Sequence, residues 1–206
     1  MLDWESYGES FARICEEWDR AEEDIKLAEQ VCHKVVFPSV KELRYAGRRI
    51  VEALNQLSTD DSAEADKKIK SLLQDAEFDC HRARHDAIDA ATAKIALDID
   101  IAVKKLGYSS ILTPYPEFPN LKNELSKVRK KIKASRRNRD NREAIYSVIE
   151  AADFGDIVEL FVGFKNAEPI MLGLAKKQRA HLLIGYAIGV MGLILAIISV
   201  LTALLS

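Results

Sequence analysis

The chain has few of the residues that bend or break helices: nine glycines and five prolines among 206 residues, below the roughly 12% that is usual for the two together. This scarcity disfavours turn-rich all-β folds and leaves few glycines for loops that cradle phosphate groups. Three cysteines, an odd number without paired spacing, argue against a disulfide framework and fit a reducing compartment. The composition therefore predicts a mostly helical chain.

The short motifs of common catalytic folds are also missing. The sequence contains no G-x-G-x-x-G, no P-loop, no G-x-S-x-G and no C-x-x-C. None of the four histidines follows an arginine at the spacing found in helical RNases of the HEPN type. We therefore expect neither an enzymatic activity nor a cofactor.

Charge is distributed unevenly, although the formal net charge of the whole chain is only -2. Residues 1–35 carry ten acidic and four basic side chains, a net of -6, whereas residues 122–142 carry ten basic and two acidic ones, a net of +8. Such a density of positive charge predicts a polyanionic partner: a phosphodiester backbone, nucleotide phosphates or anionic lipid headgroups. The alternative is a solvated face that pairs with the acidic first helix.

The basic segment has no aromatic residue on which a nucleic-acid base could stack. This favours recognition of a phosphate backbone over the reading of bases. The residues predicted to bind the polyanion are Lys127, Arg129, Lys130, Lys131, Lys133, Arg136, Arg137, Arg139 and Arg142.

The longest uncharged run covers residues 182–205. At about 1.5 Å per residue it would form roughly 36 Å of helix, enough to cross a hydrocarbon core of about 30 Å. The run is preceded by four basic residues, Lys165, Lys176, Lys177 and Arg179, and no basic residue follows it. The positive-inside rule therefore predicts that residues 1 to about 180 lie in the cytoplasm. We expect a tail-anchored membrane protein, the alternative being a buried helix of a soluble bundle.

Small and polar residues recur 3 and 4 positions apart along this run, in the alternation that keeps one stripe of a helix against a partner helix. A lone anchor needs no such stripe, so the stripe predicts a homo-oligomer. In a ring of four or more subunits, such as a tetramer, the stripe would line a pore. This small-residue seam consists of Gln178, His181, Gly185, Gly189, Gly192, Ala196, Ser199 and Ala203.

Apolar periodicity predicts three long helices in the first half of the chain. Residues 1–36 carry apolar residues 4 and 3 positions apart without a break, which is typical of coiled-coil packing. The proline in segment 37–39 is expected to end that helix, and a second helix covers residues 40–57. A third helix of some 45 residues is expected to stop at Gly107, a C-cap.

Three prolines follow within residues 108–120, which we expect to form a non-helical hinge loop. A fourth helix is predicted over residues 121–152, and the short apolar segment 154–164 suggests an interfacial helix. Asn166 is expected to cap a final helix that has Pro169 in its first turn.

The predicted fold class is all-α: a cytoplasmic bundle of long helices with a single C-terminal transmembrane helix, assembled as an oligomer. Residues 1–166 would form the cytoplasmic sensor and oligomerisation domain. Residues 167–206 would form the juxtamembrane and transmembrane helix.

Two histidines offer a possible metal site. Glu77, His81, His85 and Asp89 stand four positions apart on one helical face, and two histidines at this spacing can hold one metal ion. Neighbouring arginines add positive charge, and the zincin motif is not completed. We therefore expect a polar helical face with ion pairs and no bound metal.

This layout resembles the small membrane effectors of bacterial antiphage systems, and among them the channel-forming effectors of Hailong-type systems. The resemblance is carried by the terminal span with its small-residue seam and by the basic run 127–142. It implies that Gln178 to Ser199 line or gate a pore in the bacterial inner membrane. It also implies that phosphates are held in an inner vestibule by Lys130, Lys131, Lys133, Arg136, Arg137 and Arg139.

The leading hypothesis is an oligomeric membrane pore whose opening depolarises the cell. Its ligand would be a single-stranded DNA oligomer or a nucleotide second messenger, and the resemblance implies that a nucleotidyltransferase encoded nearby makes it. The alternative is a tail-anchored tether or SNARE-like protein, whose first helix pairs with a partner chain. A third hypothesis is a metal-dependent helical enzyme at His81 and His85.

Overall fold

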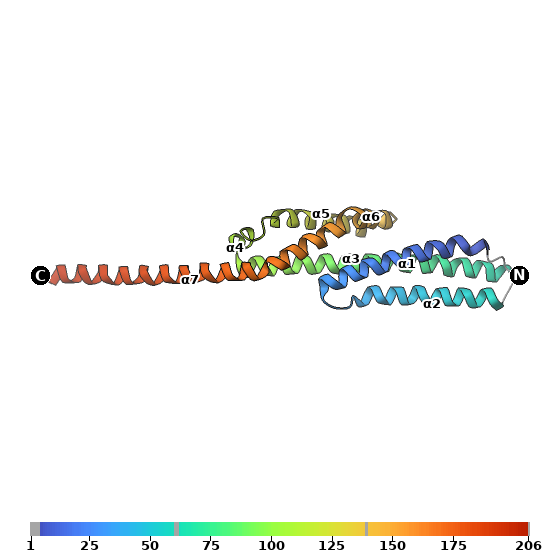
Figure 1. Cartoon of the computed structure of the whole chain (residues 1–206), viewed down its shortest axis with the longest axis horizontal. Coiled ribbons are helices and arrows are strands. Elements are labelled where there is room, and N and C mark those ends of the chain that lie inside the picture. The colour runs from blue at the N-terminus through green and yellow to red at the C-terminus, as the bar shows by residue number, and fades with distance from the viewer. Residues whose placement is uncertain (1–4, 60–61, 139, 206) are drawn as a thin grey trace. The chain divides into compact units, whose positions relative to one another are not determined.

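The computed structural model describes residues 5–59, 62–138 and 140–205, and all regular secondary structure among them is helical (Figure 1). This confirms the all-α prediction. The elements are α1 (Glu5–Cys32), α2 (Phe37–Thr59), α3 (Ala63–Leu106), α4 (Tyr108–Leu112), α5 (Phe118–Arg137), α6 (Arg142–Ile149), the π-helix η1 (Glu150–Phe154) and α7 (Gly155–Leu205).

The chain forms two compact units, each built from two segments. Unit 1 comprises Met1–Ile99 and Pro119–Val162, and unit 2 comprises Asp100–Phe118 and Gly163–Ser206. The expected single boundary at residue 166 thus differs from the observed grouping. The difference arises because the end of α3 and the proline-rich segment pack with the middle of α7.

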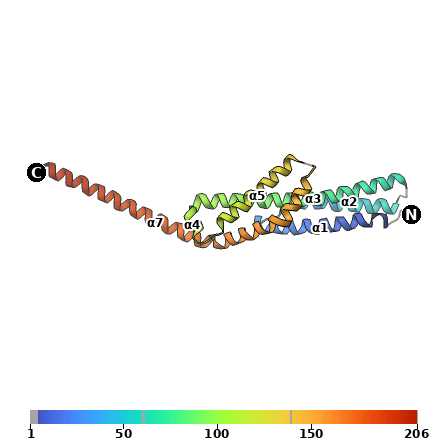
Figure 2. The same cartoon turned by 90° about the horizontal axis from the view of Figure 1, so that it is seen from above.

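Helices α1, α2 and α3 lie side by side in unit 1 (Figures 1 and 2). Contacts from Tyr7 to Asp66 and from Arg13 to Glu77 show that α1 and α3 are parallel. Contacts from Glu42 to Arg82 and from Glu52 to Lys68 show that α2 is antiparallel to α3. The expected apolar stripe of α1 supplies much of the core. Its buried members are Tyr7, Ile14, Ala21, Ile25, Ala28 and Cys32.

The end of α1 differs from the prediction. The helix stops at Cys32, His33 adopts a left-handed φ of 52°, and Val35 is 61% exposed while Val36 is buried. Segment 37–39 does not end α1 but begins α2. Proline fits this first turn because its missing N–H has no partner to lose there.

The expected third helix is confirmed. α3 has 44 residues, its buried face is rich in alanine, and Gly107 follows it with a φ of 81° that favours glycine.

The expected helix over residues 121–152 is broken into three parts. α5 ends at Arg137, α6 begins at Arg142, and the π-helix η1 follows it. The described residues of the break, Asn138, Asp140 and Asn141, are polar and suited to turns, so no apolar stripe continues across it.

The prediction of an interfacial helix at 154–164 is wrong. Phe154 lies in η1 and the remaining residues belong to α7, with Ile157, Val158 and Phe161 buried in unit 1. Packing, not membrane contact, explains this apolar segment.

Unit 2 replaces most of the expected hinge loop with packed structure. Residues 108–112 form α4 and Phe118 begins α5, so only residues 113–117 are non-helical. Phe118 stacks on Phe164 at 5.7 Å between ring centroids, and Tyr115 meets Phe164 edge-on at 5.9 Å. Gly163 makes room for this packing, because a Cβ there would lie 3.3 Å from the ring of Tyr115.

α7 is helical without a break over 51 residues, and Pro169 lies inside it. The expected start at Asn166 is therefore wrong, whereas the expected continuity from the last turns before the span into the span is confirmed. The most apolar 18-residue window in the described chain has a mean hydropathy of 2.5 and no buried residue. The described chain thus has one helical stretch near its C-terminal end that is long and apolar enough to span a membrane.

Candidate functional site

The predicted polyanion-binding residues divide between two helices. Most lie on α5, whereas Arg142 begins α6 with its guanidinium 5.6 Å from the centroid of the Tyr146 ring. Arg139 lies outside the described residues.

Some of these cations have acidic partners within unit 1. Lys127 pairs with Glu124 at 2.7 Å, Arg136 pairs with Asp89 of α3 at 2.8 Å, and Lys131 pairs with Asp153 of η1. None of the ion pairs found for Lys127–Arg137 in the described chain reaches α1. The contacts therefore do not support the alternative in which the acidic first helix neutralises the basic face.

Four cations of α5 remain exposed, with no ion pair among the described residues. We call Arg129, Lys130, Lys133 and Arg137 the basic row. Arg129, Lys133 and Arg137 follow each other four positions apart and Lys130 stands beside Arg129, so all four lie on one side of α5, away from the buried Val128 and Ile132. Four like charges this close repel each other, and an anion that bridges them would relieve the repulsion.

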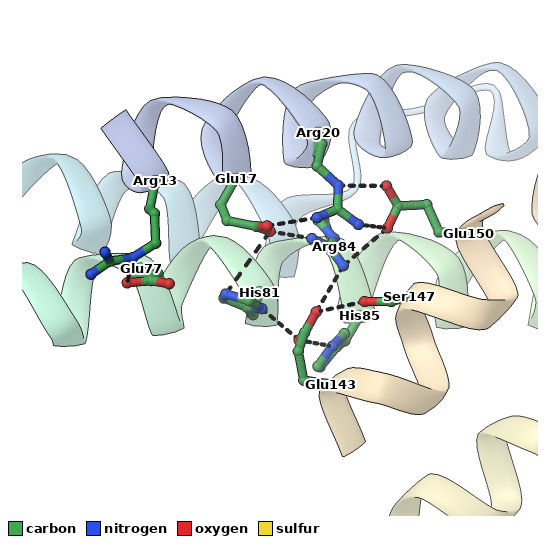
Figure 3. A network of polar contacts seen from close by, with 10 residues as sticks. All are labelled: Arg13, Glu17, Arg20, Glu77, His81, Arg84, His85, Glu143, Ser147 and Glu150. Carbon is green, nitrogen blue, oxygen red and sulfur yellow. Dashed lines mark hydrogen bonds and ion pairs between the residues drawn. The ribbon is translucent and has the colours of Figure 1, made fainter. Parts of the chain in front are cut away.

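A buried ion-pair network lies where α1, α3, α6 and η1 meet (Figure 3). At its centre is Arg84 of α3, whose side chain is 0% exposed. Arg84 pairs with Glu17 of α1, with Glu143 of α6 at 2.9 Å, and with Glu150 of η1 at 3.0 Å. One buried cation thus holds three carboxylates from three segments of the chain.

Arg20 of α1 completes the network from the other side. Its Nε and Nη2 donate to the two carboxylate oxygens of Glu150 at 2.9 and 2.7 Å, and its Nη1 donates to Glu17 at 2.6 Å. The hydrogen bonds to Glu150, opposed by partial burial, raise the pKa of Arg20. Arg20 and Arg84 therefore share two carboxylates, and the start of the π-helix is fixed against α1.

Two histidines of α3 meet the same Glu143. Its Oε2 lies 2.6 Å from His81 Nδ1 and 2.9 Å from His85 Nε2. Burial acts to raise the pKa of Glu143, but its contacts with His81, His85 and Arg84 outweigh burial and hold the pKa well below its usual range. Burial lowers the pKa of His85, so its neutral form is favoured.

A chain of contacts joins the network to α5. The His85 ring stacks on Tyr146 at 3.9 Å between centroids, and the Tyr146 hydroxyl donates to Asp89 at 2.6 Å. The other Asp89 oxygen accepts from Arg136. Burial, followed by the bond to Asp89, raises the pKa of Tyr146 to about 12, so the phenol remains a donor at neutral pH.

The predicted metal-site residues do not gather at one point. His81 and His85 join the network, but Glu77 pairs with Arg13, and Asp89 bonds to Tyr146 and Arg136. The expectation of a polar face with ion pairs is confirmed.

A different set, Glu17, His81 and Glu143, offers one ligand atom each within 4.8 Å. Arg84 already pairs with both carboxylates, so a cation there would meet a buried positive charge. The arrangement is suited first to holding helices together.

The centre of this network could not be predicted from the sequence. Glu17, like Glu143 and Glu150, resembles an ordinary exposed helix glutamate, and it lies far before the other two in the sequence. Arg84 did carry a local signal, because core residues Ala87 and Ile88 stand 3 and 4 positions after it on α3. A charge on the apolar face of a helix indicates a buried partner.

Asp24 of α1 is a buried carboxylate near this network, with 4% of the residue exposed and no hydrogen bond to Oδ2 among the described atoms. Burial, helped by the charge of Glu150, raises its pKa from 3.8 to about 7. Because the folded-state pKa is raised, the stability that Asp24 contributes is fully present below about pH 3.8 and is lost as the pH rises through 7.

We therefore expect Asp24→Asn to stabilise unit 1 at pH 8, by about 4 kcal/mol at most, since each pH unit of this difference corresponds to about 1.4 kcal/mol. The gain should shrink steadily towards pH 4. Thermal unfolding of both proteins at pH 4, 6 and 8 measures it, and Glu9→Gln, at an exposed position of α1, is the control. An equal gain at every pH would contradict this assignment.

The small-residue seam lies on α7 in unit 2. Its described side chains are exposed from His181 to Ser199, and the side chain of Ala203 lies outside the described residues. Gln178, which we expected at a pore mouth, accepts a hydrogen bond from Ser110 of α4 at 2.8 Å, and Arg179 donates to the Lys105 carbonyl. Both residues thus fasten α7 within unit 2 just before the apolar segment.

No family model, no curated protein and no solved structure matches the chain.

Proposed function

We propose that the chain is a subunit of an oligomeric channel in the bacterial inner membrane, gated by a nucleic-acid or nucleotide ligand and acting in antiphage defence by membrane depolarisation. In this proposal the helical units lie in the cytoplasm. The lysines and the arginine just before the span support this orientation.

The proposal rests on one observation. Helix α7 runs without a break from the core of unit 1, which holds the basic row, into the apolar segment. Ile157 and Phe161 of α7 are buried in unit 1, and His181 to Ser199 are exposed and almost entirely uncharged. No non-helical linker separates the two. A change in how α7 packs in unit 1 would therefore be passed to the span.

The basic row supplies the ligand site in this proposal. Oligomerisation would multiply its four uncompensated cations around an axis, and a polyanion would neutralise a ring of repelling charges. The ligand shifts the channel between two arrangements only if it binds one of them more tightly. A single-stranded DNA oligomer and a cyclic or linear nucleotide share the phosphate chemistry that the row would recognise.

The tether hypothesis receives no such support. It needs the apolar stripe of α1 to be available to another chain, but Ile14, Ala21 and Ala28 are buried within unit 1. A metal-dependent enzyme is likewise disfavoured by Arg84 beside His81.

Reversing the basic row tests the proposal. We expect Lys130→Glu combined with Lys133→Glu to weaken binding of a short single-stranded DNA to the full-length protein at least tenfold, because binding through phosphates depends on cation number. Conductance in liposomes with the DNA added should change in parallel. Fluorescence anisotropy at two salt concentrations measures the binding, and a nucleotide second messenger is assayed separately.

The matched control is Lys67→Glu with Lys104→Glu, which makes the same change of charge on exposed residues of α3 that have no ion pair in the described chain. Binding and conductance that respond equally to both pairs of substitutions, or to neither, would refute the assignment of the basic row.

A further inference from the structure

Two exposed charged faces of unit 1 have no role in the proposed function. On α1, Glu16, Asp19 and Glu23 follow each other at spacings of 3 and 4, and all three are exposed. None of them forms an ion pair among the described residues. We call them the acidic row; it faces away from the core stripe of α1, which includes Ile14, Ala21 and Ile25.

On α2 the outward face combines basic and apolar side chains. Arg44 and Arg48 are exposed and four positions apart, and no ion pair is found for either in the described chain. Phe37 is 73% exposed and Val51 57% exposed on the same face, beside the less exposed Val40. The opposite face of α2 carries the buried residues Ser39, Glu42, Leu43, Ala46 and Ala53.

The two faces match each other in charge and in spacing. Asp19 and Glu23 are four positions apart on α1, as Arg44 and Arg48 are on α2, so each pair spans about 6 Å of its helix. Exposed charges without partners contribute little to the stability of one chain, but complementary rows favour a specific partner and speed association. The flanking Phe37 and Val51 would add apolar contact area.

We infer that the acidic row of α1 in one copy of this chain docks on the Arg44–Arg48 face of α2 in a second copy. Every copy carries both halves of this interface, so the contact can be repeated without another protein. The inference rests on the proposed function in requiring self-association, but it specifies a surface in unit 1 that is separate from the span and from the basic row. A polyanion is a less suitable occupant, because the exposed apolar side chains of Phe37 and Val51 flank the arginines.

A charge exchange tests this interface with the full-length protein in detergent. We expect Arg44→Glu with Arg48→Glu to weaken self-association at least tenfold, and Asp19→Lys with Glu23→Lys to do the same. Combining all four substitutions should restore it, because the charges are then exchanged between the two faces. Light scattering over a dilution series measures the mass, and circular dichroism shows whether each variant is folded.

Lys67→Glu with Lys104→Glu is again the matched control, and it should leave the mass unchanged. Two results would overturn the inference: an unchanged mass in both reversal variants, or a loss that the combined variant does not reverse. Weaker DNA binding by the Arg44 and Arg48 variant at an unchanged mass would also overturn it, in favour of a ligand on α2. A combined variant that assembles while the native protein neither binds DNA nor conducts would refute the proposed function and leave this interface standing.

Discussion

Replacing Arg84 with methionine is expected to destabilise unit 1 by about 3–5 kcal/mol, because removing one partner of a buried charge network leaves the others uncompensated. Arg20 still reaches Glu17 and Glu150 in this variant, but Glu143 would keep only its two histidines and the hydroxyl of Ser147 among the described residues, with no arginine beside it. Methionine preserves much of the side-chain volume, so the loss reports charge more than packing. Thermal unfolding of the full-length protein at pH 7 measures the effect.

Arg13→Met, on α1, is the matched control. Its side chain is half exposed and pairs with the partly exposed Glu77 at 3.4 Å, so its loss should cost less than about 1 kcal/mol. The Arg84 deficit should also shrink as the pH falls below about 5. Without Arg84 the folded-state pKa of Glu143 rises, and protonation then removes the uncompensated charge. Equal unfolding temperatures for the two variants would contradict a central role for Arg84.

The parts of the fold that could be predicted from sequence are those that local patterns determine. The apolar stripe of α1 and the end of α3 at Gly107 each follow from residues within a few turns. Such patterns give wrong predictions where tertiary packing determines the structure. Pro169 signals a helix start, yet it lies inside α7, because the preceding residues Ile157, Phe161 and Phe164 are already held in a helix by burial.

The candidate site also has one part that could be predicted from the sequence and one part that could not. Clustered basic residues on α5 are visible in the sequence, because a helix puts residues 3 and 4 apart on one face. The network around Arg84 is not, because its carboxylates come from positions 17, 143 and 150 and meet only after α1, α3 and α6 have packed. Prediction of the span needed only length and composition, whereas prediction of the network needed the fold.

Placing aspartate at the middle of the apolar segment of α7 is expected to remove the protein from membranes. The variant Leu193→Asp with Ile197→Asp puts two carboxylates on one face of the helix, near the centre of the uncharged run. Each costs about 2.5–3.5 kcal/mol at that depth, so insertion should become less favourable by about 5–7 kcal/mol. The fraction that stays in the pellet after alkaline extraction of membranes measures insertion.

The position of the charge decides this experiment. The control is Leu182→Asp with Tyr186→Asp, at the end of the run next to Arg179, where the cost of a charge falls towards the interface. We expect the control to stay in the pellet. Unit 1 and the core of unit 2 should unfold as in the native protein in both variants, because Phe164, Met171 and Ala175 are the last buried residues of α7 in the described chain. If the two variants fractionate alike, the uncharged run is not a membrane span, and the continuity of α7 no longer supports a gated pore.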